Sequence, residues 1–299
     1  MADQTVFSTR QALTRGFTPG QLRSMKRERL LRGVYSVEPD AAQLIVQARA
    51  AVVAAGPQAR LCEATALRLA GIEMPKRFED DDRIHIQVSH AISGPRRDGI
   101  CRHRSAQQLP GTDIAGLPSL HLAECWMQLA ARATDEELVV VGDGMMRRPR
   151  PPDQRPFLVA PEVLTQAVAE SPRRPGIRAV RRTVELVRPR TDSPMESVTR
   201  FYLVRAGLPQ PAVNFPILDE TGWPVYFIDM AYPDVKVAVE YDGAIHAGKA
   251  RQIRADIGRR RRLEADGWRF IIATSDDLPD RMGTVVRITR EALCSRGAI

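Results

Sequence analysis

The sequence predicts a mixed α/β fold, α+β overall, divided into three domains. The chain has 299 residues, about twice the size of a typical single domain, so more than one hydrophobic core is expected. Apolar residues make up 43% of the chain and charged residues 27%, which is typical of globular proteins. Helix-capping signals and alternating apolar segments both occur along the chain. We expect the domains at 1–40, 41–190 and 191–299.

Simple patterns exclude several classes of protein. The most apolar stretch, 41–56, is interrupted by Gln43, Gln47 and Arg49, so we expect neither a membrane-spanning helix nor a membrane partner. The first ten residues lack a basic segment followed by an apolar one, which predicts a cytoplasmic protein. The four cysteines form no C-x-x-C pair and the histidines no H-x-x-x-H motif, so neither a zinc finger nor a disulfide framework is expected. We expect all four cysteines to be reduced and largely buried.

The first domain begins with two short helices. Ser8 is placed to cap a helix that ends before Gly16. Thr18 is placed to cap a second helix, which has Pro19 at its first position and runs to about Arg27. This pattern predicts a helix-turn-helix.

A hairpin follows the two helices. The segment 30–37 predicts a strand, a turn at Arg32-Gly33 and a second strand. A helix-turn-helix with such a hairpin is a winged helix, which presents the cations of its second helix and wing to DNA. The alternative is a solvated basic face on a small helical domain, since a net charge of +8 does not by itself identify a partner. The candidate DNA-binding cations are Arg23, Lys26, Arg27, Arg29 and Arg32.

The middle domain predicts a mixture of helices and strands. Helices are expected at about 41–55, 59–70, 120–132, 161–170 and 176–187, and strands near 84–88 and 100. The Pro/Arg-rich tract 147–156 has too many prolines for regular structure and predicts an exposed loop.

The last domain combines a capped helix with two strands that carry acids. Ser193 and Glu196 have capping-box spacing at the start of a helix. Strands are expected at 225–230 and 235–242, joined by a turn at 231–234.

Three carboxylates on these strands are the candidate catalytic groups. Alternation places Glu240 and Asp242 on one face of the second strand. A turn closed by Ala231 and Asp234 would put Asp229 on the same face. In that register Asp229 and Glu240 are four residues apart along the strand, about 13 Å, so strong twist, a bulge or splayed strands would be needed to bring them together.

Clustered carboxylates predict a divalent cation, Mg²⁺ or Mn²⁺, because hard oxygen ligands suit these ions. Such an ion activates water and stabilises the leaving oxygen in phosphodiester hydrolysis. The segment 249–262 concentrates cations against the single acid Asp256, and would face the phosphates of DNA or RNA unless it is an ordinary solvated helix face. The candidate nucleic-acid-binding cations there are Lys249, Arg254, Arg259 and Arg260.

The order of these residues resembles the PD-(D/E)XK nuclease superfamily, closest to its branch related to very-short-patch mismatch repair endonucleases. The resemblance covers about residues 191–299. It implies a restriction-endonuclease-like mixed sheet flanked by helices, with Asp229 and Glu240 as metal ligands. The residues that carry it are Asp229, Glu240-Tyr241-Asp242-Gly243, His246, Asp256 and Gly267-Trp268.

The same resemblance gives roles to further residues. Glu196 would be the carboxylate of the first helix, although it fits a plain helix cap equally well. Asp242 stands where the wider superfamily has lysine, which leaves the water-polarising cation to Lys249, Arg254 or His246. The alternatives are a turn-forming role for Asp242 and an ordinary loop histidine at 246.

The segment 7–37 resembles the winged-helix domain of AbiEi-type antitoxins of type IV toxin–antitoxin systems. This resemblance implies operator DNA and a cognate toxin as partners. Two functions therefore compete. One is a DNA-binding protein with a metal-dependent endonuclease domain, acting in repair or defence. The other is an antitoxin-like transcriptional repressor whose nuclease fold is not catalytic.

Overall fold

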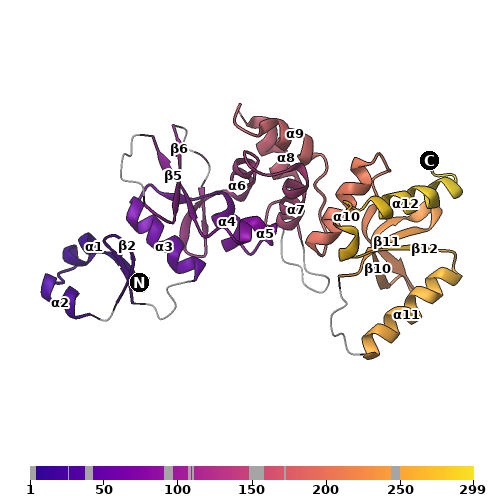
Figure 1. Cartoon of the computed structure of the whole chain (residues 1–299), viewed down its shortest axis with the longest axis horizontal. Coiled ribbons are helices and arrows are strands. Elements are labelled where there is room, and N and C mark those ends of the chain that lie inside the picture. Colours follow the sequence, from indigo (N-terminus) through magenta and orange to yellow (C-terminus); the bar gives the residue numbers. More distant parts are fainter. Residues whose placement is uncertain are drawn as a thin grey trace. The chain divides into compact units, whose positions relative to one another are not determined.

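The computed structural model describes residues 5–25, 27–37, 43–90, 97–106, 109, 111–147, 158–171, 173–243 and 250–299, with the backbone alone for 250–257. It combines helices with mixed sheets, which confirms the predicted α/β fold class. The chain forms two compact units, whose helices and strands are labelled in Figure 1. The first unit contains 1–133 and 166–180, and the second contains 134–165 and 181–299.

The first unit begins with a three-stranded antiparallel sheet and two capped helices. Ser8 and Thr18 cap their helices, as the sequence predicts, and the structure shows that both do so within capping boxes. Gly33 has a φ of 78° at the turn of the hairpin, a conformation that glycine adopts without strain. The helices are α1 (Thr9–Thr14) and α2 (Pro19–Ser24), and the strands lie in the order β1 (Val6–Ser8), β3 (Val34–Ser36), β2 (Glu28–Leu31).

Helix α3 (Leu44–Ala55) completes the core of this small sheet. Val46 and Ala50 pack against Val6 and Val34, and all four side chains are buried. The packing of the winged-helix segment therefore continues past residue 40.

A five-stranded mixed sheet forms the rest of the first unit. Its β7–β8 hairpin was not predicted, and its turn carries Ala115 and Gly116 at φ values of 52° and 77°. The predicted helix 59–70 begins later, because Arg60 and Leu61 form strand β4. The strand order is β6 (Ile100–Ser105), β5 (Ile84–Ser89), β4 (Arg60–Leu61), β8 (Leu117–Leu120), β7 (Gly111–Ile114). The helices are α4 (Glu63–Leu69), α5 (Lys76–Glu79) and α6 (Leu122–Leu129).

Three helices follow in the chain: α7 (Asp135–Met145), which was not predicted, α8 (Pro161–Glu170) and α9 (Ile177–Val184). Most of the predicted loop 147–156 lies outside the described residues. In the second unit, α10 (Pro194–Arg205) packs on α7. Arg200 and Asp143 form a fully buried ion pair between these two helices, with 2.6 Å between Nη2 and Oδ2.

The second unit contains a four-stranded mixed sheet between helices (Figure 1). Helices α10 and α12 pack on one face of the sheet, where Val198 and Val285 meet Val239. Helix α11 packs on the other face, where Leu263 meets Ala238. The strand order is β12 (Arg269–Ala273), β11 (Val237–Tyr241), β10 (Pro224–Tyr232), β9 (Ala212–Leu218). The remaining elements are α11 (Ala250–Ala265), α12 (Gly283–Ser295) and the short 3₁₀ turns η1 (Pro233–Val235) and η2 (Ser275–Asp277).

Two further expectations concern the membrane and the cysteines. In the part of the chain that the structure describes, no helix is both long and apolar enough to cross a membrane. All four cysteines are free thiols, but only Cys62 and Cys125 are buried. Cys101 is half-buried and Cys294 is exposed, so the prediction that the cysteines are largely buried is wrong for these two.

Candidate active site

The candidate site lies on the hairpin of β10 and β11. Ala231 pairs with Ala238, so the expected pairing of Ala231 with Asp234 is wrong. The 3₁₀ turn Pro233–Val235 widens the connection, and Lys236 leaves it with a φ of 48°. Strand β11 consequently starts two residues later than predicted, and the register moves by four residues.

The observed register places Asp229 next to Glu240. Main-chain pairing ends at Met230 and Val239, and one further step along both strands sets Asp229 opposite Glu240. Here the Asp229 side chain takes part in joining the strands, since its Oδ2 accepts a hydrogen bond from the Tyr241 amide at 3.0 Å. The wider turn therefore removes the offset of about 13 Å that the predicted register implied.

Glu240 points to the face of the sheet that α11 covers. It alternates with Val239 and lies on the same side as Ala238, as the sequence predicts. Its side chain is buried, with 6% of the residue exposed. One carboxylate oxygen accepts a hydrogen bond from the Tyr226 hydroxyl. The other accepts one from Arg260 on α11 at 3.1 Å.

These two partners make a buried carboxylate tolerable beside apolar side chains. Arg260 supplies the opposite charge that a buried carboxylate needs. Burial raises the pKa of Tyr226 far above its usual range, and the neighbouring Glu240 raises it further, so the hydroxyl remains a donor at neutral pH. Arg259 adds a cation 5.1 Å from the centre of the Tyr226 ring.

Glu196 is turned toward the start of its own helix. Its amide donates to Ser193 Oγ at 3.2 Å, and its Oε2 accepts from the Asp192 amide at 2.8 Å. Burial raises the pKa of its carboxyl group. These bonds favour the helix-capping interpretation of Glu196 over a catalytic one.

The other predicted residues lie at the edge of the described region. Asp242 follows β11, is exposed, and donates its amide hydrogen to the Ala273 carbonyl at 2.8 Å. His246 and Lys249 lie outside the described residues, as does the side chain of Arg254. Their expected roles remain predictions.

The donor chemistry at Asp229 and Glu240 suits a hard divalent cation, because both offer carboxylate oxygens. Both oxygens of Glu240 already have protein partners, so an ion bound there would replace Arg260 or Tyr226. Within the described ranges, one group of three potential ligands has its donor atoms within 4.8 Å of one another, and it lies in the first unit. Asp229 and Glu240 are thus suited to bind the ion together, each through its carboxylate group.

Arg260 has a different role in the structure from the one that the sequence predicts. It was expected to bind nucleic acid, yet it pairs with Glu240. The sequence feature that indicates this inward position is the spacing of Arg260 from Leu263. Residues three apart share a helix face, and Leu263 is buried against the sheet.

The predicted DNA-binding cations of the first domain differ in their exposure to solvent. Arg23, Arg29 and Arg32 are exposed on α2, β2 and the hairpin turn. Arg27 is half-buried, with its guanidinium 4.0 Å from the centre of the Tyr35 ring, so it contributes less charge to the surface than expected. Lys26 lies outside the described residues.

Comparison with known proteins finds two relatives. Both are uncharacterized proteins of Mycobacterium tuberculosis, from two strains, and each is 35% identical to this chain over 129 residues. The alignment covers 42% of this chain and 47% of each relative, so the chain spans about half the length of the curated relatives it matches. No protein-family model and no solved structure matches the chain.

Proposed function

We propose that the second unit carries a metal-dependent endonuclease domain and that the first unit contributes a winged helix that binds DNA. The observation that supports this most directly is the register of β10 and β11. It sets Asp229 opposite Glu240 where the main-chain pairing ends, beside the arginine-rich helix α11.

Asp229 and Glu240 would hold the divalent ion, Mg²⁺ or Mn²⁺. When bound, such an ion lowers the pKa of a water molecule and stabilises the charge on the leaving oxygen of a phosphodiester. The Tyr241 amide fixes the Asp229 carboxylate, and Tyr226 fixes that of Glu240. Arg260 now pairs with Glu240, and if an ion took its place there, its planar guanidinium would be suited to contact a phosphate.

A second function, an antitoxin-like repressor with a silent nuclease fold, is favoured by one observation. Arg260 already occupies one oxygen of Glu240, as a permanent structural ion pair would. The two functions share the winged helix and differ in whether the Glu240 carboxylate is released to a cation.

Incubation of supercoiled plasmid with the purified protein tests the proposal. We expect nicked or linear product with Mg²⁺ or Mn²⁺ and intact plasmid with EDTA. A duplex RNA of equal length, tested in parallel, shows which nucleic acid is cut. Plasmid that stays intact with both metals, while the protein still binds DNA, would instead support the repressor.

A further inference from the structure

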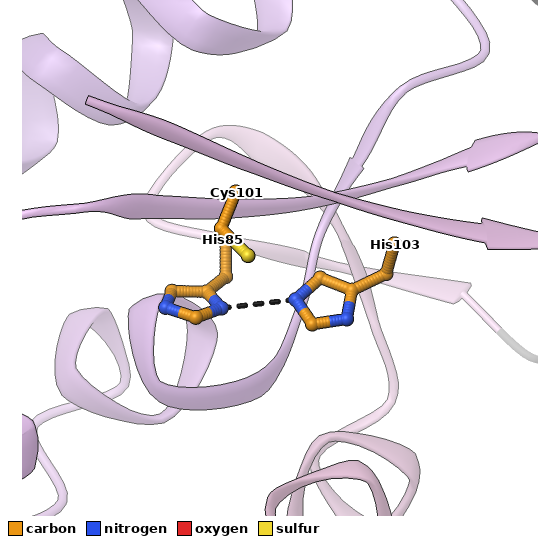
Figure 2. Close-up of side chains that lie close together, drawn as sticks. All are labelled: His85, Cys101 and His103. Carbon is orange, nitrogen blue, oxygen red and sulfur yellow. Dashed lines mark hydrogen bonds between the residues drawn. The ribbon is translucent and has the colours of Figure 1, made fainter. Parts of the chain in front are cut away.

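A cluster of metal-ligand side chains lies in the first unit, far along the sequence from the acidic pair (Figure 2). His85 lies on β5, and Cys101 and His103 lie on the parallel neighbour β6, where His85 pairs with Cys101. The ligand atoms of the three residues all lie within 4.8 Å of one another. His85 Nδ1 and His103 Nε2 face each other at 2.9 Å.

We propose that His85, Cys101 and His103 form a binding site for Zn²⁺. Imidazole nitrogen and thiolate sulfur are the ligands that zinc prefers in proteins. In a tetrahedral site with the usual Zn–N bond length, two nitrogens are about 3.3 Å apart, so the two rings need to separate by only about 0.4 Å. This inference is independent of the proposed nuclease activity.

One contact of His85, with Asp81, is of the kind that a zinc-binding histidine makes. Such a histidine usually donates its second ring N–H to a carboxylate, which fixes the tautomer that binds the metal. His85 Nε2 lies 3.2 Å from Asp81 Oδ2, whereas Nδ1 faces His103 Nε2 at 2.9 Å and also lies 2.6 Å from Glu63 Oε2. An ion at Nδ1 would take the place of the proton shared with Glu63 and leave Nε2–H to Asp81. Arg132 holds Asp81 in place at 3.1 Å. His85 itself is buried, with 2% of the residue exposed.

Glu63 adds a second carboxylate that is held against the cluster. Its Oε2 lies 2.6 Å from His85 Nδ1, and Arg132 binds both of its oxygens. Glu63 has a φ of 50°, in a region that non-glycine residues seldom occupy, and such backbone strain is concentrated at functional sites. The strained residue therefore brings a second negative charge, besides that of Asp81, to the proposed zinc ligands.

The charges around the cluster accommodate a divalent cation. Glu63 and Asp81 balance the guanidinium groups of Arg83 and Arg132, which pair with them. Zinc binding converts the Cys101 thiol to a thiolate and releases its proton to solvent. The bound site then carries one net positive charge, held by Zn²⁺ and one thiolate.

Three protein ligands leave the fourth tetrahedral position to a water molecule or a small ligand. His103 also lines a cavity of about 480 Å³, together with Gln87, Gln128 and Arg174. Both Cys101 and His103 are half-buried, so neither residue is fully closed off from solvent.

The test measures zinc in the full-length chain. The protein is stripped with EDTA, incubated with one equivalent of ZnCl₂, passed through a desalting column and analysed by mass spectrometry of the metal. We expect about one zinc per chain for the wild type, and affinity at least tenfold weaker for Cys101→Ser and His103→Gln. Asp81→Asn should weaken binding about 10–100-fold. With Co²⁺ in place of zinc, the wild type should show a thiolate-to-cobalt charge-transfer band that Cys101→Ser lacks.

Two matched variants serve as controls. Cys294→Ser removes an exposed cysteine of the second unit, and Glu240→Gln removes the acid of the candidate nuclease site, so both should keep the zinc. Circular dichroism confirms that each variant is folded. A wild type that retains no zinc, or a folded Cys101→Ser variant that binds zinc as tightly as the wild type, would overturn the proposal. Loss of zinc in Glu240→Gln would place the bound ion at the acidic pair instead.

Discussion

Glu240 illustrates at the scale of one residue how the candidate site depends on charge compensation. A buried carboxylate is costly without partners, and Glu240 has two, Tyr226 and Arg260. Neither partner is an acid, so a sequence pattern of carboxylates does not reveal them. The pairing of Glu240 with Arg260 is also the point at which the two proposed functions separate.

Tyr202 carries a prediction about pH. Burial, together with a hydrogen bond to the Glu136 carboxylate, raises its pKa to about 12 from 10. Because the pKa is higher in the folded state, the stabilisation from this group is complete below pH 10 and is lost as the pH rises to about 12. Because solvent screens this partly exposed pair, we expect the wild type to lose only about 1 kcal/mol more than Tyr202→Phe across this range, measured by urea unfolding. Parallel losses in the two proteins would contradict this.

Helix caps contribute to the stability of individual helices. The capping box of Thr134 and Glu137 begins α7, the helix that carries the buried Asp143. Thr134→Ala removes the side-chain acceptor for the Glu137 amide and should lower the free energy of unfolding of the second unit by about 1 kcal/mol. Thr165→Ala in the exposed part of α8 is the control and should change it by less than about 0.5 kcal/mol. Equal effects of the two variants would show that the cap is not what stabilises α7.

The winged helix gives a prediction about DNA. Arg23→Ala combined with Arg32→Ala removes two exposed cations from α2 and the hairpin turn. The slope of log affinity against log salt should become shallower by about 2, since each phosphate contact contributes about 0.9. Fluorescence anisotropy with a labelled duplex measures the slope. Arg281→Ala with Arg287→Ala, two exposed residues of the second unit, is the control and should leave the slope unchanged. If the control variant changes the slope and the winged-helix variant does not, DNA binds elsewhere.

For the molecule as a whole, we expect a mutation in one of the two units to destabilise that unit and not the other. Arg200→Met leaves Asp143 buried without its ion-pair partner, which costs about 3–5 kcal/mol. Hydrogen exchange should then increase in 181–299 and stay unchanged in 43–90. The matched variant Arg174→Met breaks the pair with Glu124 in the first unit and should have the reverse distribution. Exchange that rises in both units for both variants would show that they unfold together.

The sequence predicts some of the helix caps and strands of this structure and not others. The caps at Ser8, Thr18 and Ser193 were found because capping depends on neighbours in the chain. Strand β4 was missed because two residues carry too little pattern to reveal a strand. The alternation on β11 was predicted correctly, whereas its register depended on a 3₁₀ turn that no local signal specified.

The zinc ligands were missed for a related physical reason. Cys101 and His103 alternate along one strand, and His85 joins them only through the parallel pairing of β5 with β6. Ligand spacing along the sequence cannot show a contact that the sheet creates. The cluster therefore contains neither a C-x-x-C nor an H-x-x-x-H motif.

The central claim is that Glu240 binds a catalytic metal, and the rate of plasmid nicking in Mg²⁺ tests it most directly. Glu240→Gln keeps the volume and a hydrogen-bond acceptor for Tyr226 but removes the charge. The control Glu264→Gln makes the same change at an exposed position on α11. We predict that Glu264→Gln nicks plasmid at the wild-type rate and that Glu240→Gln, folded and still able to bind DNA, loses at least 100-fold, about 2.7 kcal/mol of transition-state stabilisation. Nicking by Glu240→Gln at the wild-type rate would contradict the assignment of the active site.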